Sequence, residues 1–155
     1  MKLFVILILT LVAFSVSAEP FVVIVRHAEK VDNSKDPDLS PAGQERAERL
    51  AGMLKDAKIT GIFVTELKRT QETAAPLSKM IGVAPTIVAA KDYATLLSKV
   101  RQVEGGSLVV GHGNTIPDVV KALGIETPVQ ISDEDYSDLL IVTLGEKPQM
   151  LRLHY

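Results

Sequence analysis

The sequence predicts an α/β fold built around a mostly parallel central sheet. Short apolar runs rich in β-branched residues alternate with helix-like patterns along the chain, which is typical of βαβ units. The run at 21–26 shows no polar alternation, as expected for a strand that is buried on both faces. No internal repeat or long linker divides these segments. We therefore expect one domain with one continuous sheet.

The expected strands and helices alternate until the chain ends in two strands. Strands are expected at 21–26, 59–65, 86–90 and 108–111, and helices at 41–55, 66–81, 93–103 and 115–123. Ser40 is the expected cap of the first helix. Pro76 predicts a kink or a new start within the second helix. The β-rich runs 136–144 and 149–153 flank Gly145-Glu146-Lys147-Pro148 and predict a β-hairpin at one edge of the sheet.

The first eighteen residues are set apart from this domain by their composition. Lys2 is followed by an apolar run at 3–14, and the small residues Val16-Ser17-Ala18 precede Glu19, which is the pattern of a cleavable secretory signal peptide. We expect cleavage after Ala18 and a periplasmic or secreted mature protein. An uncleaved N-terminal anchor is the alternative, although the apolar run is short for a membrane span. The chain has no Cys, so a lipid-modified cysteine is excluded.

The remaining residues, 19–155, suffice for a single domain with a full core. The formal net charge of the chain is −2, and loss of Lys2 makes it slightly more negative. This balance predicts no general affinity for nucleic acid or for an anionic membrane. Any basic character must therefore be local.

Three segments place a cation or an imidazole just past the end of an expected strand. Arg26 and His27 end the first, Arg69 lies four residues beyond the second, and His112 follows the strand at 108–111. An open α/β sheet gathers its ligand-binding groups at these strand ends. Guanidinium groups fit phosphate oxygens, and an imidazole is a competent nucleophile near neutral pH. The pattern predicts a site for a phosphoryl group, although solvated strand ends and helix faces would carry the same residue types.

Four motifs occur in a fixed order between about residues 21 and 123. They are Arg26-His27-Ala28-Glu29, Leu39-Ser40-Pro41-Ala42-Gly43-Gln44, Thr65-Glu66-Leu67-Lys68-Arg69-Thr70-Gln71-Glu72-Thr73-Ala74 and Gly111-His112-Gly113-Asn114-Thr115. The ordered set resembles the histidine phosphatase superfamily, which includes phosphoglycerate mutases, bacterial phosphohistidine phosphatases and related small phosphatases. The resemblance implies a three-layer α/β/α sandwich, with residues 19–155 as one histidine phosphatase domain.

The resemblance also implies the roles of the site residues. His27 would be transiently phosphorylated, and Arg26, Arg69 and His112 would complete the phosphate pocket. It implies no metal and no cofactor, which agrees with the lack of a convincing Cys/His or carboxylate ligand cluster in the sequence. Ala28 stands where glycine usually follows the nucleophile, and we expect the added methyl group to be tolerated.

The sequence leaves three alternatives for the group that protonates the leaving group. Relatives use an acidic residue after the third strand, and Asp92 is the nearest carboxylate, but Asp92 can equally cap the helix at 93–103. Glu29 is the second candidate. If neither serves, substrates with good leaving groups, such as phosphohistidine or phosphoramidates, are favoured. Asn33, in the polar loop at 28–39, matches an asparagine that lies near the phosphate in some relatives.

The expected function is an exported, metal-independent phosphatase that hydrolyses phosphomonoesters or phosphoramidates through a phosphohistidine on His27. Its expected partner is a small phosphorylated substrate or a phosphoprotein. Mutase activity is disfavoured because the chain is short for that class. A protein phosphohistidine phosphatase is the alternative within the enzyme class, and a phosphate- or polyanion-binding relative without turnover is the alternative outside it. Neither the substrate nor the oligomeric state follows from the sequence.

Overall fold

The protein folds around a six-stranded mixed sheet. The computed structural model describes residues 19–155, and the predicted signal peptide lies outside the described residues. The strands are β1 (Phe21–Arg26), β2 (Ile59–Val64), β3 (Thr86–Ile87), β4 (Gly106–Gly111), β5 (Asp138–Thr143) and β6 (Gln149–His154). The helices are α1 (Pro41–Leu54), α2 (Lys68–Ile81), α3 (Tyr93–Val100) and α4 (Ile116–Ala122). The strand order is β3-β2-β4-β1-β5-β6.

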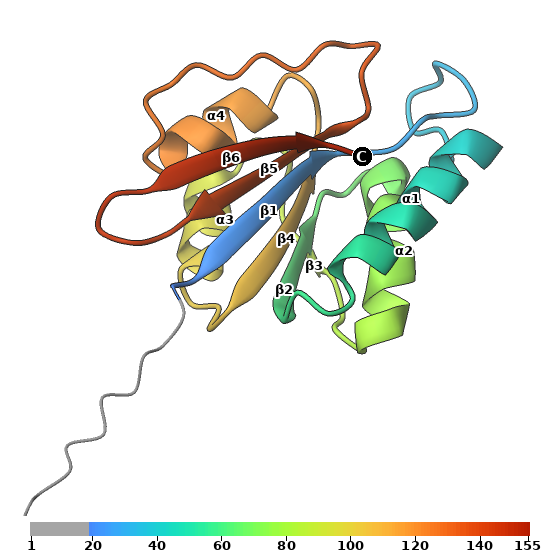
Figure 1. Cartoon of the computed structure of the whole chain (residues 1–155). Coiled ribbons are helices and arrows are strands. Elements are labelled where there is room, and N and C mark those ends of the chain that lie inside the picture. The colour runs from blue at the N-terminus through green and yellow to red at the C-terminus, as the bar shows by residue number, and fades with distance from the viewer. Residues whose placement is uncertain (1–18) are drawn as a thin grey trace, which may run out of the picture.

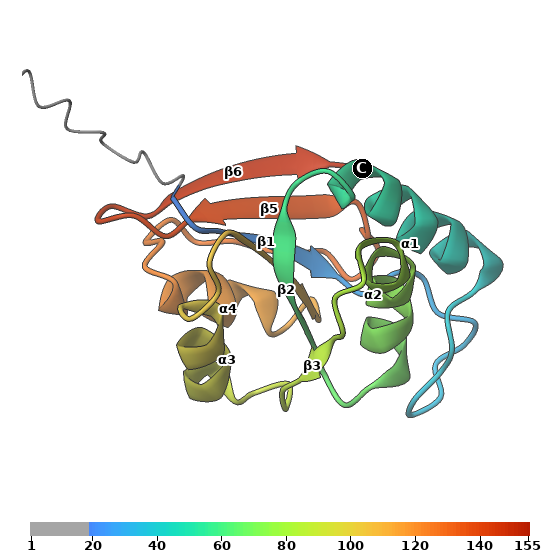
Figure 2. The same cartoon turned by 90° about the horizontal axis from the view of Figure 1, so that it is seen from below.

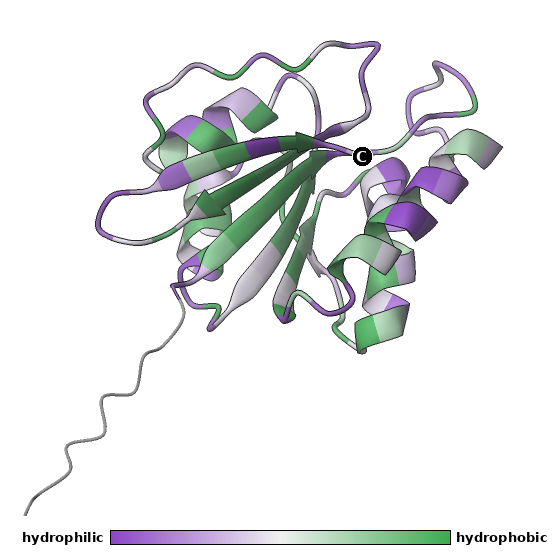
Figure 3. Cartoon of the chain, viewed as in Figure 1, coloured by the Kyte–Doolittle hydropathy of each residue, from purple (hydrophilic) through white to green (hydrophobic). Residues whose placement is uncertain are grey.

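The predicted three-layer sandwich is confirmed. Helices α1 and α2 cover one face of the sheet, and α3 and α4 cover the other (Figures 1 and 2). Successive side chains of a strand point to opposite faces, so β1 contributes Val23 to the core under α1 and α2 and Ile24 to the core under α3 and α4. Figure 3 shows the apolar residues concentrated in the central strands, with polar residues on the outer surface of α1.

The predicted sheet topology is confirmed as well. Strands β1 and β4 pair in parallel, as do β2 with β4 and β2 with β3. Strand β5 runs antiparallel to β1, and β6 pairs antiparallel with β5 as the outermost strand, which is the expected hairpin at one edge. The carboxyl ends of the parallel strands lie together at one end of the sheet, where Arg26 lies opposite Gly111.

Local sequence explains how α1 and α2 begin and end. The Ser40 side chain accepts a hydrogen bond from the Gly43 amide at 3.1 Å, which confirms it as the cap of α1. Helix α2 runs through Pro76 without a break, so the single backbone hydrogen bond lost there does not end a helix whose inner face, including Leu77, is buried. It ends at Gly82, whose φ of 71° is the left-handed conformation that favours glycine.

Several boundaries differ from the sequence prediction by one to three residues. Strand β3 ends at Ile87 instead of residue 90, because the Asp92 amide donates to the Ala89 carbonyl in a turn before α3. Helix α3 ends at Val100 instead of residue 103. Strand β4 begins at Gly106, two residues earlier than predicted. A side chain at this position would collide with Phe21 on the neighbouring strand, so the close pairing with β1 requires glycine here. None of the described helices combines the length and the apolar character that crossing a bilayer needs.

Candidate active site

The sheet brings together the four residues that the sequence singles out. Arg26 and His27 end β1, His112 follows β4, and Arg69 lies in the first turn of α2. The imidazole centroids of His27 and His112 are 5.5 Å apart. The charges of Arg69 and Arg26 act on both imidazoles. Arg26, His27 and His112 are nearly buried, so this is a packed site and not a set of solvated strand ends.

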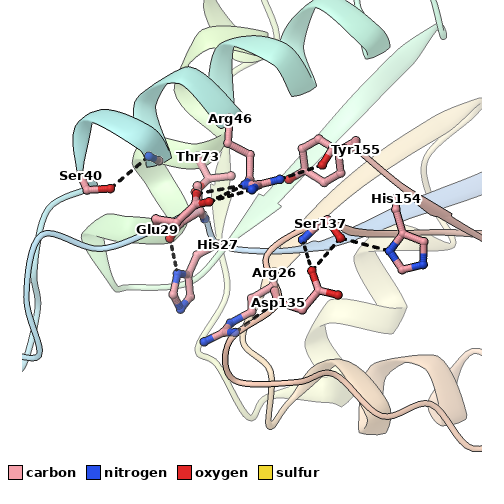
Figure 4. A network of polar contacts seen from close by, with 12 residues as sticks. Arg26, His27, Glu29, Ser40, Arg46, Thr73, Asp135, Ser137, His154 and Tyr155 are labelled. Carbon is pink, nitrogen blue, oxygen red and sulfur yellow. Dashed lines mark hydrogen bonds and ion pairs between the residues drawn. The ribbon is translucent and has the colours of Figure 1, made fainter.

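His27 is held in one tautomer. Its Nδ1 lies 2.8 Å from the Ala28 carbonyl oxygen (Figure 4). Because a carbonyl oxygen can only accept, Nδ1 carries the proton and donates, which leaves the lone pair on Nε2. The Ala28 amide in turn donates to Thr73 Oγ1 at 2.9 Å, so helix α2 fixes the backbone directly after the nucleophile candidate.

Both imidazoles are neutral near pH 7. Burial and the charges of Arg69 and Arg26 lower the pKa of His27 to about 3, although the hydrogen bond to the Ala28 carbonyl acts to raise it. Burial and the charge of Arg69 lower the pKa of His112 to about 4, with a small opposing contribution from Glu66. A neutral imidazole with a free Nε2 can act as a nucleophile without a base to remove a proton first.

Several buried nitrogen atoms in the site have no partner. Within residues 19–155, four buried side-chain nitrogen or oxygen atoms lack a hydrogen bond, and three belong to the site: Arg26 Nε, Arg69 Nε and His112 Nε2. Burying a polar group without a partner costs about 1–3 kcal/mol. Three such groups gathered around His27 are the arrangement expected of a site that is completed by an oxyanion.

Comparison with known proteins agrees with this geometry. Residues 22–92 match the family model described as histidine phosphatase superfamily (branch 1). This stretch of the chain, which contains Arg26, His27 and Arg69, is similar to the histidine phosphatase superfamily. The PE-PGRS family protein PE_PGRS11 of Mycobacterium tuberculosis is 36% identical over 73 residues, which are 41% of this chain. The chain spans only 12% of the length of that relative.

Solved structures of several phosphatases share the fold. A structure assigned as phosphohistidine phosphatase SixA from Agrobacterium tumefaciens has a TM-score of 0.67 at 21% identity and covers 86% of this chain and 97% of that one. SixA complexed with tungstate has a TM-score of 0.69 at 18% identity, with 86% and 96% covered. A mycobacterial glucosyl-3-phosphoglycerate phosphatase with VO3 has a TM-score of 0.67 at 14% identity, with 86% and 97% covered.

The carboxylates of both predicted proton donors are engaged by other groups of the protein. The Asp92 carboxylate caps α3 by accepting from the Thr95 amide at 3.1 Å, and hydrogen bonds from Thr95 lower its pKa. Although burial acts to raise the pKa of Glu29, hydrogen bonds from Arg46 outweigh it and the pKa falls below its usual value. Arg46 Nη2 lies 2.7 Å from Glu29 Oε1 and Nη1 donates to the main-chain oxygen of Tyr155 (Figure 4).

The position of Asn33 does not support a role as a phosphate ligand. Two residues near the site, Glu66 and Tyr136, were not singled out from the sequence. Asn33 lies in an exposed loop, where its Oδ1 accepts from Lys30 at 3.1 Å. Glu66, two residues beyond the end of β2, is the carboxylate whose charge acts on His112. The Tyr136 ring lies 4.2 Å from Arg26 Cζ, with its centroid 6.0 Å from that of His27. The position of Glu66 beside a strand end could have indicated it, whereas nothing local marks Tyr136.

One group of side chains in the described part of the chain has metal-binding spacing. Ligand atoms of Asp135, Asp138 and His154 lie within 4.8 Å of one another. Both oxygens of Asp138 already accept from Arg152, at 2.6 and 2.8 Å. Ser137 Oγ lies between Asp135 Oδ1 and His154 Nδ1, at 2.6 and 3.1 Å (Figure 4). These contacts use the ligand atoms within the protein itself.

Proposed function

We propose that this protein is a phosphatase that works through a phosphohistidine on His27. The observation that carries the proposal is the combination of a neutral His27 with a free Nε2 and three partnerless buried nitrogen atoms around it. A site that only bound anions would gain from a charged imidazole, whereas a nucleophile must keep its lone pair. The match of residues 22–92 to the histidine phosphatase superfamily model supports the same role.

In the proposed reaction the Nε2 lone pair of His27 attacks phosphorus. The N–P bond forms while the bond from phosphorus to the leaving oxygen or nitrogen breaks, and the leaving group takes that electron pair and a proton. Water then attacks the phosphoryl group, the N–P bond breaks and orthophosphate is released. Arg26, Arg69 and His112 bind the phosphoryl oxygens, whose negative charge these groups balance without a metal ion.

Glu66 is the proton donor of this proposal. It lies at the end of β2 next to α2, and its charge acts on His112. Its Oε2 accepts a hydrogen bond from the Ala90 amide at 3.1 Å, and its other oxygen has no such bond. By contrast, Glu29 is paired with Arg46 and Asp92 caps a helix. Glu66 therefore keeps one carboxylate oxygen without a hydrogen bond within residues 19–155, whereas Glu29 forms an ion pair and Asp92 serves as a helix cap.

A second candidate is hydrolysis of a phosphoramidate, such as phosphohistidine in a protein. The observation in its favour is that neither Glu29 nor Asp92 is a ready acid, and a phosphoramidate needs less acid assistance than an alkyl phosphate. The fold shared with SixA is consistent with it. The signal-like sequence of residues 1–18 supports an exported enzyme, which favours extracellular or periplasmic substrates over cytosolic phosphoproteins.

The test compares the purified protein with its His27→Ala variant. The wild type should release phosphate from 4-nitrophenyl phosphate and form a base-stable, acid-labile phosphoryl adduct, which alkaline quenching followed by mass spectrometry can place on His27. The variant should show neither. Phosphate release by His27→Ala at the wild-type rate would exclude His27 as the nucleophile. A wild type that binds orthovanadate but turns over no phosphomonoester or phosphoramidate would support the non-catalytic binding alternative.

A further inference from the structure

Residues 132–136 contact Arg26 through main-chain carbonyls and an aromatic ring, without forming an ion pair. Arg26 Nη1 donates to the main-chain carbonyls of Ser132 and Asp133 at 2.8 Å each, and to that of Asp135 at 3.3 Å. The Tyr136 ring covers the guanidinium at 4.2 Å. We call these three carbonyls and this ring the Arg26 clamp.

We propose that the Arg26 clamp aims Arg26 at the phosphoryl group, with Tyr136 as its positioning residue. The proposal rests on the proposed function only in naming the phosphoryl group as the anion. A guanidinium is planar, and two of its nitrogen atoms can form a fork that matches two oxygens of an oxyanion. The Arg26 clamp contacts Nη1 and one face of the guanidinium plane. The edge of the guanidinium that the clamp does not contact contains Nε, which is buried and has no hydrogen-bond partner among the described residues.

The clamp restrains Arg26 without neutralising it. Three acidic residues lie in the segment, yet the contacts to Arg26 come from main-chain oxygens, and Arg26 forms no ion pair within residues 19–155. The Asp135 carboxylate accepts from the Ser137 amide and hydroxyl at 2.7 and 2.6 Å instead. A carboxylate paired with Arg26 would compete with a phosphoryl group for the same positive charge, whereas carbonyl dipoles fix the direction of the guanidinium without an ion pair.

Tyr136 also lies beside the nucleophile. Its ring centroid is 6.0 Å from that of His27, and the two planes are inclined by 59°. The same ring therefore contacts the cation that receives the phosphoryl oxygens and limits the space around the attacking imidazole. The ring is anchored because Tyr136 stands two residues before β5 and the Tyr155 amide donates to the neighbouring Ser137 carbonyl at 2.9 Å. Loss of the ring should weaken oxyanion binding through Arg26.

The experiment measures orthovanadate affinity and kcat/KM for 4-nitrophenyl phosphate in Tyr136→Leu and Tyr136→Phe. Tyr136→Leu should raise the Kd and lower kcat/KM by about 3- to 30-fold, the range of a desolvated cation–π contact. Tyr136→Phe keeps the ring face and should recover most of this loss. Tyr93→Leu is the matched control, because Tyr93 hydrogen-bonds Asp118 on α4 and does not contact Arg26.

The double variant with Arg26→Gln separates positioning from general destabilisation. If Tyr136 acts through Arg26, Tyr136→Leu should change the Kd by less than about twofold in the Arg26→Gln background. An equal effect of Tyr136→Leu in both backgrounds, or no effect in the wild-type background, would overturn the proposal. Orthovanadate binding requires no turnover. A protein that binds vanadate through the clamp but shows no His27-dependent phosphate release would therefore contradict the proposed function and not the clamp.

Discussion

Acidification should destabilise the folded protein through its two buried imidazoles. The pKa of His27 lies at about 3 and that of His112 at about 4 because both are desolvated next to arginine charges. In the unfolded chain a histidine has its ordinary pKa of about 6.5. Between these values the unfolded chain binds protons that the folded protein does not. Stability is therefore complete above about pH 6.5 and is lost as the pH falls toward the folded pKa values.

The size of the effect follows from the shift of His27. Between pH 7 and pH 4.5 the unfolded imidazole becomes almost fully charged, while the folded one stays almost fully neutral. Linkage then gives a loss of about 2 to 3 kcal/mol from His27 alone, and a smaller loss from His112, whose pKa is shifted less. A loss of this size is a large fraction of the roughly 5–15 kcal/mol that stabilises a typical domain.

Urea unfolding of the wild type and of His27→Gln at both pH values isolates this contribution. The wild type should lose about 2 kcal/mol more than the variant on going to pH 4.5, because the substituted amide side chain has no proton to exchange in this range. The chain has only three histidines, so NMR can follow each imidazole, with His27→Gln and His112→Gln assigning the signals. A His27 imidazole that titrates near pH 6.5, or equal pH dependence in both proteins, would refute the buried, cation-flanked geometry of the site.

Three further predictions concern single side chains. Gly43→Ala places a methyl group against the Glu29 carbonyl oxygen and should cost about 1 to 3 kcal/mol of unfolding free energy, whereas Gly52→Ala on the same helix meets no atom within 4 Å and should stabilise. Arg69→Ala should lower kcat/KM by roughly two to four orders of magnitude with little change in the thermal midpoint, and a wild-type rate would remove Arg69 from the pocket. Glu66→Gln should slow alkyl phosphates at least about tenfold more than 4-nitrophenyl phosphate, and equal slowing of both would exclude a proton donor at Glu66.

Much of the phosphate pocket could be predicted because its information is local. Arg26, His27 and His112 each follow directly after a run that is apolar throughout, so the sequence marks both the strand and the side chains at its end. The βαβ pattern then makes those strands parallel and brings their ends to one edge. Ser40 could be predicted for the same reason, since a helix cap depends on the few residues next to it.

The contacts that position these groups could not be predicted, because they join distant segments through loops. Arg26 reaches carbonyl oxygens more than a hundred residues further along the chain, and their direction depends on the path of a loop without regular structure. The pairing of Glu29 with Arg46 depends on how α1 packs over the first loop. The cap at Asp92 was one of two alternatives that its residue type allowed. Only the packed structure decides between them.

Arg26 and Arg69 have two effects on the site: their charges attract a phosphate, and they disfavour protonation of His27. A bound phosphate partly cancels the second effect. In the free protein the charges of Arg26 and Arg69 help to keep His27 unprotonated. A phosphate dianion that binds between them would cancel much of that charge and so raise the pKa of His27 and His112 in the complex. Binding and protonation are linked reciprocally, so an anion that raises these pKa values favours proton uptake by the two imidazoles as it binds. The two arginines therefore keep the His27 lone pair available in the free protein, and the anion that they bind removes part of this effect.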